Sequence, residues 1–312
     1  MRSRVIPGIA VPASALCLGT AGFGSAVARD DAFALLDAFA AQGGTFLDTA
    51  HIYASWLPGG TGASERTVGA WLASRGMRAR MLVATKGGHP ELTPAAPSRL
   101  RPEDIARDLH ESLERLGVER IDLYWLHRDD PALPVGEILS ALAPHVGAGR
   151  IAAIGASNWM PERLAQADAW ARANGVPGFV ASSIGWSLAR AVPEHVPPGG
   201  MTFMDAEQRA WYRASGVPVV AYSAQANGFF AKADAPPALF VAPDNVGRRA
   251  RVADLAHSRG VSANALALAW LLAQPGLASA VIGPRTSAQL HDSLESLAIE
   301  LDDATCAWLD LR

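Results

Sequence analysis

Three things are scarce in this chain of 312 residues: cysteine, long apolar runs, and basic charge in excess of acidic charge. Cys17 and Cys306 are too few and too far apart to form a disulfide framework, and we expect both to be buried small hydrophobic residues. No apolar run approaches the roughly 20 residues that a membrane-spanning helix requires. The formal net charge of -3 leaves no basic surface for nucleic acid. These absences argue against a secreted disulfide scaffold, a membrane protein and a nucleic-acid-binding protein.

The amino terminus lacks the pattern of a secretory signal. The first four residues carry positive charge, but the apolar stretch that follows, residues 5–15, is interrupted by Pro7, Gly8 and Pro12. We therefore expect the protein to be cytoplasmic.

Sequence signatures of metal or serine catalysis are also missing. The stretch from His110 to Glu114 lacks the second histidine of a zinc-binding helix, and no G-x-S-x-G sequence is present. No metal site is predicted.

Short apolar segments alternate with amphipathic ones along the chain. Eight apolar segments are predicted strands: residues 16–20, 46–49, 81–86, 121–127, 151–157, 180–184, 217–222 and 279–282. The predicted helices are residues 31–42, 64–74, 102–116, 135–146, 161–174, 287–296 and 302–311, with Ser64 as the expected N-cap of the second. Alternation of this kind indicates a parallel sheet, and eight strands predict a closed (β/α)8 TIM barrel over residues 1–312 as one domain.

An open, doubly wound sheet is the rival fold. It would need a glycine-rich dinucleotide turn leading directly from the first strand into a helix. Residues 19–24 are spaced as G-x-x-G-x-G instead, and no helix follows at once. We therefore favour the barrel.

Three segments interrupt the repeat, namely residues 54–63, 188–205 and 231–245. Each is rich in glycine, proline or both and follows a strand, where barrel loops build the binding pocket. The chain ends soon after its last predicted helix, so we expect no long C-terminal tail to cover that pocket. The sequence does not decide between a monomer and an oligomer in which a neighbour's loop closes the pocket.

Functional side chains follow three successive predicted strands. Asp48 and Tyr53 come after one strand, Lys86 ends the next, and His127 ends the one after that. Any one of them alone could have a structural role, because aspartate caps turns, tyrosine is often half-buried and a lone lysine usually faces solvent. Since parallel strands all end on the same face of a barrel, the four side chains together predict a single site.

This order, Asp-x-x-x-x-Tyr, then Lys, then His, resembles the catalytic tetrad of the aldo-keto reductases. The resemblance extends over nearly the whole chain, through Leu-Gly-Thr at 18–20, Ala-Ser-Glu-Arg at 63–66, Ile-Gly-Ala-Ser-Asn at 154–158 and Val-Ile-Gly-Pro-Arg at 281–285. It implies a barrel with an N-terminal β-hairpin on its floor, formed by the apolar stretch before Pro12. It also implies reduction of a carbonyl compound by NADPH.

Carbonyl reduction needs a proton donor at the developing alkoxide, and the resemblance makes Tyr53 that donor. Lys86 would favour the phenolate of Tyr53 through its positive charge, and Asp48 would hold the lysine. His127 would orient the carbonyl. In the reverse direction, the same tyrosine would act as the base in alcohol oxidation.

The resemblance further implies residues that bind the nicotinamide end of the cofactor. Ser157 and Asn158 would hydrogen-bond its carboxamide, and Ser183 stands where the family often has glutamine. Trp186 would stack on the nicotinamide ring. Two alternatives stay open: Ser157 or Asn158 could cap the helix at 161–174, and Trp186 could belong to the core.

The phosphate and adenosine ends are assigned to two later stretches. Residues 222–228 resemble the loop that wraps the pyrophosphate; the assigned residues there are Tyr222, Ser223, Gln225, Asn227 and Gly228. Residues 283–289 would receive the adenosine end of NADP, with Gly283, Arg285 and Gln289 as the assigned residues. Arg285 can grip a 2'-phosphate with paired donors, although a solvated surface arginine is the simpler alternative. NADPH is therefore expected in preference to NADH.

The predicted function is reduction of an aldehyde or ketone, including sugar-derived ones. The sugar preference depends on Trp56, Trp125 and Trp159, which could form an aromatic pocket mouth or pack elsewhere. The alternative is an NADP(H)-binding redox-sensing regulatory subunit with slow turnover, like the potassium-channel β subunits that resemble this family.

Overall fold

The computed structural model describes residues 1–93, 96–197, 199–231 and 236–312. Eight parallel strands close into a barrel in the order β10-β3-β4-β5-β6-β7-β8-β9. Their bounds are β3 Leu16–Gly19, β4 Phe46–Asp48, β5 Leu82–Gly87, β6 Ile121–Leu126, β7 Ile151–Ser157, β8 Phe179–Gly185, β9 Val219–Tyr222 and β10 Leu277–Ile282. The predicted (β/α)8 barrel is therefore confirmed.

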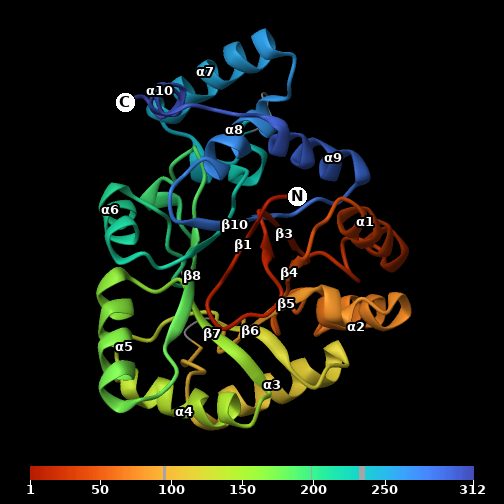
Figure 1. Cartoon of the computed structure of the whole chain (residues 1–312), viewed down its shortest axis with the longest axis vertical. Coiled ribbons are helices and arrows are strands. Elements are labelled where there is room, and N and C mark those ends of the chain that lie inside the picture. The colour runs from red at the N-terminus through yellow and green to blue at the C-terminus, as the bar shows by residue number, and fades with distance from the viewer. Residues whose placement is uncertain (94–95, 198, 232–235) are drawn as a thin grey trace.

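Helices form a ring outside the barrel (Figure 1). Their bounds are α1 Arg29–Ala41, α2 Ala63–Arg75, α3 Pro102–Leu116, α4 Val135–Gly147, α5 Pro161–Asn174, α6 Ala206–Ser215, α7 Pro243–Arg259, α8 Ala263–Leu272, α9 Ser287–Glu295 and α10 Asp303–Leu309. The sequence did not predict α6, α7 or α8. Helix α8 has no polar face to reveal a helical period, because it is buried on nearly all sides.

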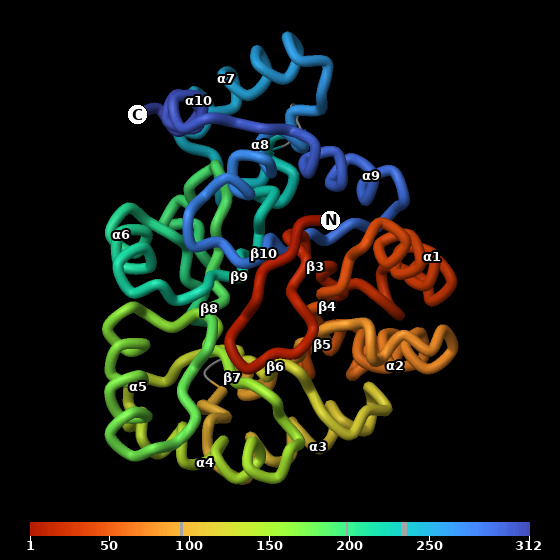
Figure 2. The backbone as a smooth tube through the Cα atoms, viewed as in Figure 1, coloured from red at the N-terminus to blue at the C-terminus, as the bar shows by residue number. Residues whose placement is uncertain are grey.

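The N-terminal hairpin is confirmed as well. Strands β1 (Ser3–Arg4) and β2 (Ala13–Ser14) pair antiparallel, and Figure 2 shows this red segment lying across one end of the barrel. Ile6 and Ile9, between the two strands, join the hydrophobic cluster inside the barrel. The hairpin thus seals the end of the barrel at which the strands begin.

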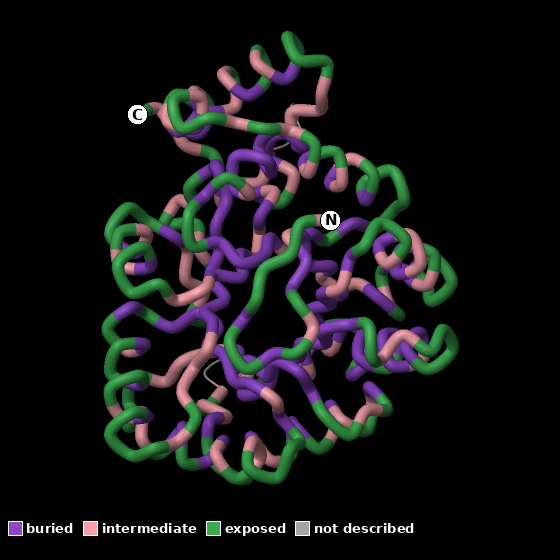
Figure 3. Tube along the Cα trace, in the orientation of Figure 1, coloured by how far each residue is buried: buried purple, intermediate pink, exposed green. Residues whose placement is uncertain are grey.

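Side-chain alternation along the strands separates two cores. Phe46, Leu82 and Leu123 belong to the cluster inside the barrel, whereas their sequence neighbours Leu47 and Val83 pack outward against the helices. Figure 3 shows buried backbone along the strands and the inner sides of the helices, with exposed residues on the outer sides. By the same alternation, every second side chain near the end of a strand also faces the inside of the barrel.

The predicted capping role of Ser64 is wrong. Helix α2 begins at Ala63 after Gly62, with no side-chain cap. The Ser64 hydroxyl is fully buried, donates to the carbonyl oxygen of Thr20 at 2.7 Å, and lies 2.8 Å from Oγ1 of Thr49. It joins the ends of β3 and β4 because the helix start packs directly against them.

The three predicted loops are borne out only in part. Of the predicted loop 54–63, residues 54–62 form turns and irregular backbone, and α2 begins at Ala63. The described part of 188–205 is also irregular, apart from a short 3-10 helix at Pro193–His195 and an isolated bridge at Phe203. The segment 231–245 ends early, because α7 already begins at Pro243. Residues 198 and 232–235 lie outside the described residues. Within the described ranges, no helix has the length and apolar character to cross a membrane.

Candidate active site

Asp48, Lys86 and His127 all lie where parallel strands end at the open mouth of the barrel. Asp48 is the last residue of β4, Lys86 is the penultimate residue of β5, and His127 directly follows β6. Each stands an even number of residues after a side chain of the inner cluster, so each points to the inner side of its strand. All three are buried.

Lys86 is the centre of the site. Its Nζ lies 2.5 Å from Oδ2 of Asp48 and donates to the carbonyl oxygen of Thr49 at 2.8 Å. It also donates to the hydroxyl oxygen of Tyr53 at 3.0 Å. The three donor positions of the ammonium group are therefore all used, which fixes the phenol relative to the ion pair.

Tyr53 is carried by a turn that is tied to β5. The backbone N–H of His51 donates to the carbonyl oxygen of Lys86 at 2.9 Å, and that of Tyr53 donates to Ala50 at 3.1 Å. Ala54 then adopts a left-handed backbone (φ 67°), which is costly for a residue with a Cβ. The turn therefore holds Tyr53 over Lys86 at the expense of local strain.

His127 completes the predicted tetrad. Its ring lies edge-on to that of Tyr53 at a centroid distance of 6.0 Å, and edge-on to that of His89 at 4.8 Å. Its backbone N–H donates to Gly87 at 2.8 Å, which continues the pairing of β5 with β6. The buried Nδ1 has no hydrogen-bond partner among the described residues. The structure thus brings all four predicted residues together.

Burial and charge set the protonation states of these groups. Burial alone would lower the pKa of Lys86, but the charge of Asp48 and the contact with Tyr53 outweigh it and raise that pKa to about 12. Burial raises the pKa of Tyr53 although Lys86 opposes the change, so the net direction is opposite to the expected stabilisation of the phenolate. Burial and the charges of Arg128 and Lys86 hold the pKa of His127 well below its usual range. At neutral pH the site therefore contains an ammonium, a neutral phenol and a neutral imidazole.

A tryptophan lies inside the barrel on the strand next to Lys86. Trp125 is paired in register with Lys86 and is completely buried. Gly155 on the neighbouring strand makes room for it, because a Cβ at that position would lie 2.3 Å from the indole ring. The indole thus packs in the barrel interior next to the strand that carries Lys86.

Asn158 lies beside the tetrad and is fully hydrogen-bonded within the protein. Its Nδ2 donates to the carbonyl oxygen of His127 and to Oγ of Ser157, both at 3.1 Å. Its Oδ1 accepts from the backbone N–H of Thr202 at 3.0 Å and from the hydroxyl of Tyr222 at 2.6 Å. Neither Ser157 nor Asn158 caps α5, since Met160 is the N-cap and no side chain bonds there. The capping alternative is therefore excluded.

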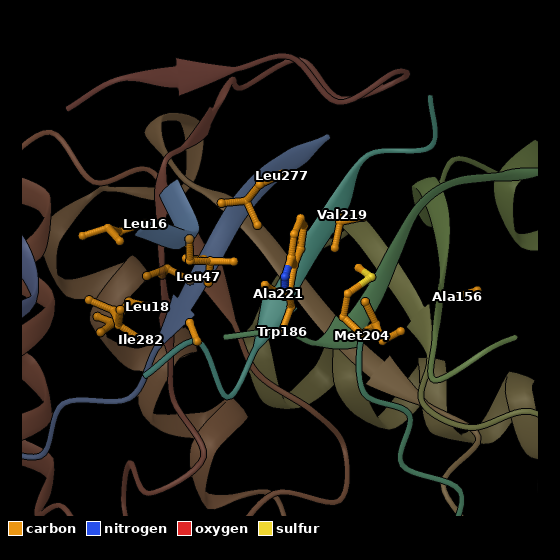
Figure 4. Close-up of a cluster of buried hydrophobic side chains, with 14 of the residues drawn as sticks. Leu16, Leu18, Leu47, Ala156, Trp186, Met204, Val219, Ala221, Leu277 and Ile282 are labelled. Carbon is orange, nitrogen blue, oxygen red and sulfur yellow. The ribbon is translucent and has the colours of Figure 1, made fainter. Parts of the chain in front are cut away.

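Trp186 and Ser183 lie on opposite sides of the same strand end. Trp186 is 5% exposed and belongs to the cluster between barrel and helices, where Figure 4 shows it beside Val219, Ala221 and Met204. Of the two roles considered for Trp186, the structure therefore favours packing in the core over stacking on the nicotinamide ring. Ser183 is buried on the inner face, in register with Ser157 on β7. Its position suits a contact with a bound molecule at the barrel mouth.

The turn after β9 has an unusual backbone. Ser223, Ala226 and Asn227 adopt positive φ values of 49°, 48° and 54°, and Gly228 has a φ of 84°. Backbone N–H groups in a turn can bind an anion, but those of Ala226 and Gly228 donate to the carbonyl oxygens of Ser223 and Gln225 at 2.8 and 2.9 Å. Strain of this kind in residues other than glycine is typical of functional loops.

The segment before α9 is linked to that turn. The Nε2 of Gln225 donates to Oγ of Ser293 at 3.0 Å, and Ser293 in turn donates to the carbonyl oxygen of Gln289 at 2.9 Å. The side chain of Gln289 accepts from the backbone N–H of Arg285 at 2.7 Å. Ser293 thus connects the two predicted cofactor segments.

Arg285 and Gly283 flank the start of α9 in open surroundings. Arg285 is exposed, and within the described ranges it forms no ion pair. A Cβ added to Gly283 would meet no atom within 4 Å. Thr286 caps the helix by accepting from the N–H of Gln289. A free guanidinium beside a helix N-terminus suits a phosphate group.

The sequence did not single out two groups that the structure places at the site. Arg128 follows His127 and donates through Nη1 to the carbonyl oxygen of His127 at 2.8 Å. His51 bonds through Nε2 to Glu111 of α3 at 2.9 Å and so ties the Tyr53 turn to the helix layer. Both occupy strand-end or loop positions, but neither belongs to the motif that carries the resemblance.

Of the three tryptophans that could line the mouth of the barrel, only one is exposed. Trp125 and Trp159 are completely buried, so they are core residues. Trp56 is 53% exposed, and its ring lies 6.4 Å from that of Tyr53.

Two surface cavities lie away from the tetrad. One of about 1290 Å³ lies between α4 and α5, and one of about 730 Å³ lies between α2 and α3. Neither is lined by Asp48, Tyr53, Lys86 or His127. In the part of the chain that the structure describes, no three His, Cys, Asp or Glu side chains are grouped as metal ligands.

Known proteins resemble this chain in sequence and, in one solved structure, in fold. The family model described as Aldo/keto reductase family matches residues 15–310. The uncharacterized oxidoreductase YrpG of Bacillus subtilis (strain 168) is 33% identical over 302 residues, which cover 93% of this chain and 89% of the relative. The norsolorinic acid reductase stcV of Emericella nidulans is 30% identical over 321 residues, or 96% and 78% of the two chains. A solved structure, the thermostable aldo-keto reductase Tm1743 with the inhibitor epalrestat, has a TM-score of 0.77 and 24% identity over 100% of this chain and 99% of its own.

Proposed function

Because this chain belongs to the aldo/keto reductase family and is an NAD(P)H-dependent oxidoreductase, we propose that it reduces an aldehyde or ketone to an alcohol with NADPH, with Tyr53 as the general acid. The observation that carries the proposal is the contact of Lys86 Nζ with both Asp48 Oδ2 (2.5 Å) and the Tyr53 hydroxyl (3.0 Å). A phenol in this position is poised to give its proton to a carbonyl oxygen.

The protonation states support reduction at neutral pH. The raised pKa of Tyr53 keeps its hydroxyl protonated, so the proton is present when the alkoxide develops. The Lys86 ammonium then stabilises the phenolate that remains, and Asp48 holds the ammonium in place. His127 is neutral and can donate one hydrogen bond to the same carbonyl oxygen. NADPH, when bound, supplies the hydride.

The backbone and side chains of the later loops fit such a cofactor. The turn that contains Ser223, Gln225, Asn227 and Gly228 would hold the pyrophosphate through backbone N–H groups other than those of Ala226 and Gly228, which donate within the turn. Arg285, exposed beside the capped start of α9, would hold the 2'-phosphate and so favour NADPH over NADH.

At the nicotinamide end, two assignments are refined. Ser157 and Ser183 are the better carboxamide partners, because all four hydrogen-bonding positions of Asn158 are already used within the protein. Tyr222, an even number of residues after the inward-facing Val220, offers an aromatic face on the pocket side, whereas Trp186 lies in the core. Of the three tryptophans expected at the mouth, only Trp56 is exposed. It is therefore the only one of the three that could stack on a sugar-derived substrate.

The test is Tyr53→Phe, assayed with a panel of aldehydes and ketones by the loss of nicotinamide absorbance. We expect NADPH binding to persist and kcat for reduction to fall about 10²- to 10⁴-fold, the usual contribution of a general acid. The matched control is Tyr212→Phe, which removes a buried hydroxyl that is 2.7 Å from Ser182 on the outer side of the barrel. Full turnover in Tyr53→Phe would disprove the acid assignment. A wild-type protein that binds NADPH tightly but reduces no carbonyl would instead indicate a redox-sensing regulatory subunit.

A further inference from the structure

Arg128 places a guanidinium group at the edge of the tetrad. Its Nη1 donates to the carbonyl oxygen of His127 at 2.8 Å, the same oxygen that Asn158 Nδ2 contacts at 3.1 Å. Its Nε donates to the carbonyl oxygen of Gly199 at 2.6 Å, in the loop that also contacts Asn158 through Thr202. The guanidinium therefore bridges the end of β6 and the loop that contacts Asn158 beside the tetrad.

This cation has no carboxylate partner within the described ranges, although acidic residues lie next to it in sequence. Asp129 pairs with Arg163, with Nε 2.9 Å from Oδ2. Asp130 accepts from the backbone N–H of Ala132 at 3.0 Å. The Nη2 of Arg128 donates no hydrogen bond to any described residue, and the side chain is half-buried. Carbonyl oxygens accept hydrogen bonds from the guanidinium but carry no formal negative charge, so the positive charge of this half-buried group is not neutralised.

We propose that Arg128 binds a carboxylate on the substrate, so that this enzyme acts on carbonyl compounds that carry an acid group, such as oxo acids and formyl-substituted aromatic acids. The inference rests on the proposed function. A planar guanidinium can place paired N–H groups on a carboxylate, and the two backbone contacts of Arg128 leave Nη2 as the donor that faces no protein group. Its attachment to His127 sets the distance between the bound acid group and the reacting carbonyl.

The electrostatics agree with this placement. Burial lowers the pKa of Arg128, because the charged guanidinium is partly removed from water. The same charge contributes to the low pKa of His127. A bound carboxylate would offset the cost of burying the cation, which an uncharged substrate cannot do.

The experiment compares each acid with its own methyl ester. The substrates are 4-formylbenzoate and 4-oxobutanoate, each with its ester, and the proteins are wild type, Arg128→Gln, Arg128→Lys and the control Arg172→Gln. Arg172 lies in an exposed pair with Asp168 on α5. We expect wild type and the control to prefer at least one acid in kcat/KM. We expect Arg128→Gln to lose about 10- to 100-fold of that acid-to-ester ratio, mainly through KM, and Arg128→Lys to keep part of it.

Direct binding supplies a second readout. Titration calorimetry with 4-(hydroxymethyl)benzoate in the presence of NADP should show a matching loss of affinity in Arg128→Gln. An acid-to-ester ratio that Arg128→Gln leaves unchanged, even with both activities lowered, would show that Arg128 only holds the loop and would overturn the proposal. Ester reduction without any acid preference in wild type would overturn it too, while leaving the proposed function intact. Absence of reduction with all four compounds and the wider carbonyl panel would instead reject the proposed function.

Discussion

Replacing Lys86 with methionine should separate the structural role of the ion pair from its chemical role. Methionine keeps much of the length of the side chain but removes all three hydrogen bonds of Nζ, to Asp48, Thr49 and Tyr53. Asp48 then becomes a buried carboxylate without a counter-charge. Breaking one partner of a buried pair costs about 3–5 kcal/mol of folding free energy, so we expect a loss of that size near neutral pH.

The pH dependence of this loss has a definite sign. Burial already raises the pKa of Asp48, and Lys86 opposes that rise, so removing the lysine raises the pKa further. A carboxyl group whose folded pKa is raised destabilises the protein only when it is ionised in the unfolded state. The deficit of Lys86→Met should therefore be smallest below about pH 4, near the ordinary pKa of aspartate. It should grow as the pH rises toward the raised folded pKa of Asp48.

The assay is denaturant unfolding of Lys86→Met and of the double variant Asp48→Asn/Lys86→Met, at acidic and neutral pH. Neutralising both partners removes the unpaired charge, so the double variant should regain much of the lost stability while carbonyl reduction stays abolished. The control is Arg172→Met, which breaks an exposed pair with Asp168 and should cost about 1 kcal/mol or less. A Lys86→Met loss as small as that of the control, or one that does not vary with pH, would refute the buried ion pair.

Two further predictions concern Gly155 and His127. Gly155→Ala should lower the free energy of unfolding by about 1–3 kcal/mol and reduce activity, because the new Cβ would lie 2.3 Å from the ring of Trp125, the register partner of Lys86. Gly147→Ala, where a Cβ meets nothing, is the control, and equal stability of the two variants in denaturant unfolding would contradict this packing. Because burial lowers the pKa of His127, its contribution to stability is complete above about pH 6.5 and is lost as the pH falls, at up to about 1.4 kcal/mol per pH unit. His127→Gln should flatten that slope in unfolding measured between neutral and acidic pH, and an unchanged slope would count against a neutral buried imidazole.

The barrel and the grouping of the four side chains could be predicted because both follow from local sequence patterns. Apolar strands recur with helices between them, and Asp48, Lys86 and His127 lie at or next to the ends of three of these strands. The parallel direction of all strands then turns positions far apart in sequence into neighbours in space. No long-range contact had to be known in advance.

Predictions failed where a side chain's role depended on packing between elements. Ser64 has the type and position of an N-cap, yet its hydroxyl lies against Thr20 and Thr49 because the start of α2 sits on the strand ends. Trp186 follows a strand at a position that suits a binding site, but it points to the helix side of the sheet. Which face a residue takes just after a strand depends on where pairing stops, and the sequence does not show that to within one residue.

Arg128 shows why the substrate is harder to predict than the reaction. The proton chemistry needs four residue types at the ends of neighbouring strands, and those types are rarely interchangeable. Substrate recognition needs only a suitable charge at the right distance, which any loop or strand end can supply. Arg128 is recognisable as a specificity residue only after its contacts with His127 and Gly199 show that a cation is held at the tetrad without a carboxylate among the described residues. The specificity of such a barrel therefore depends on which charges its loops leave unpaired, and that is a property of the folded mouth and not of any motif.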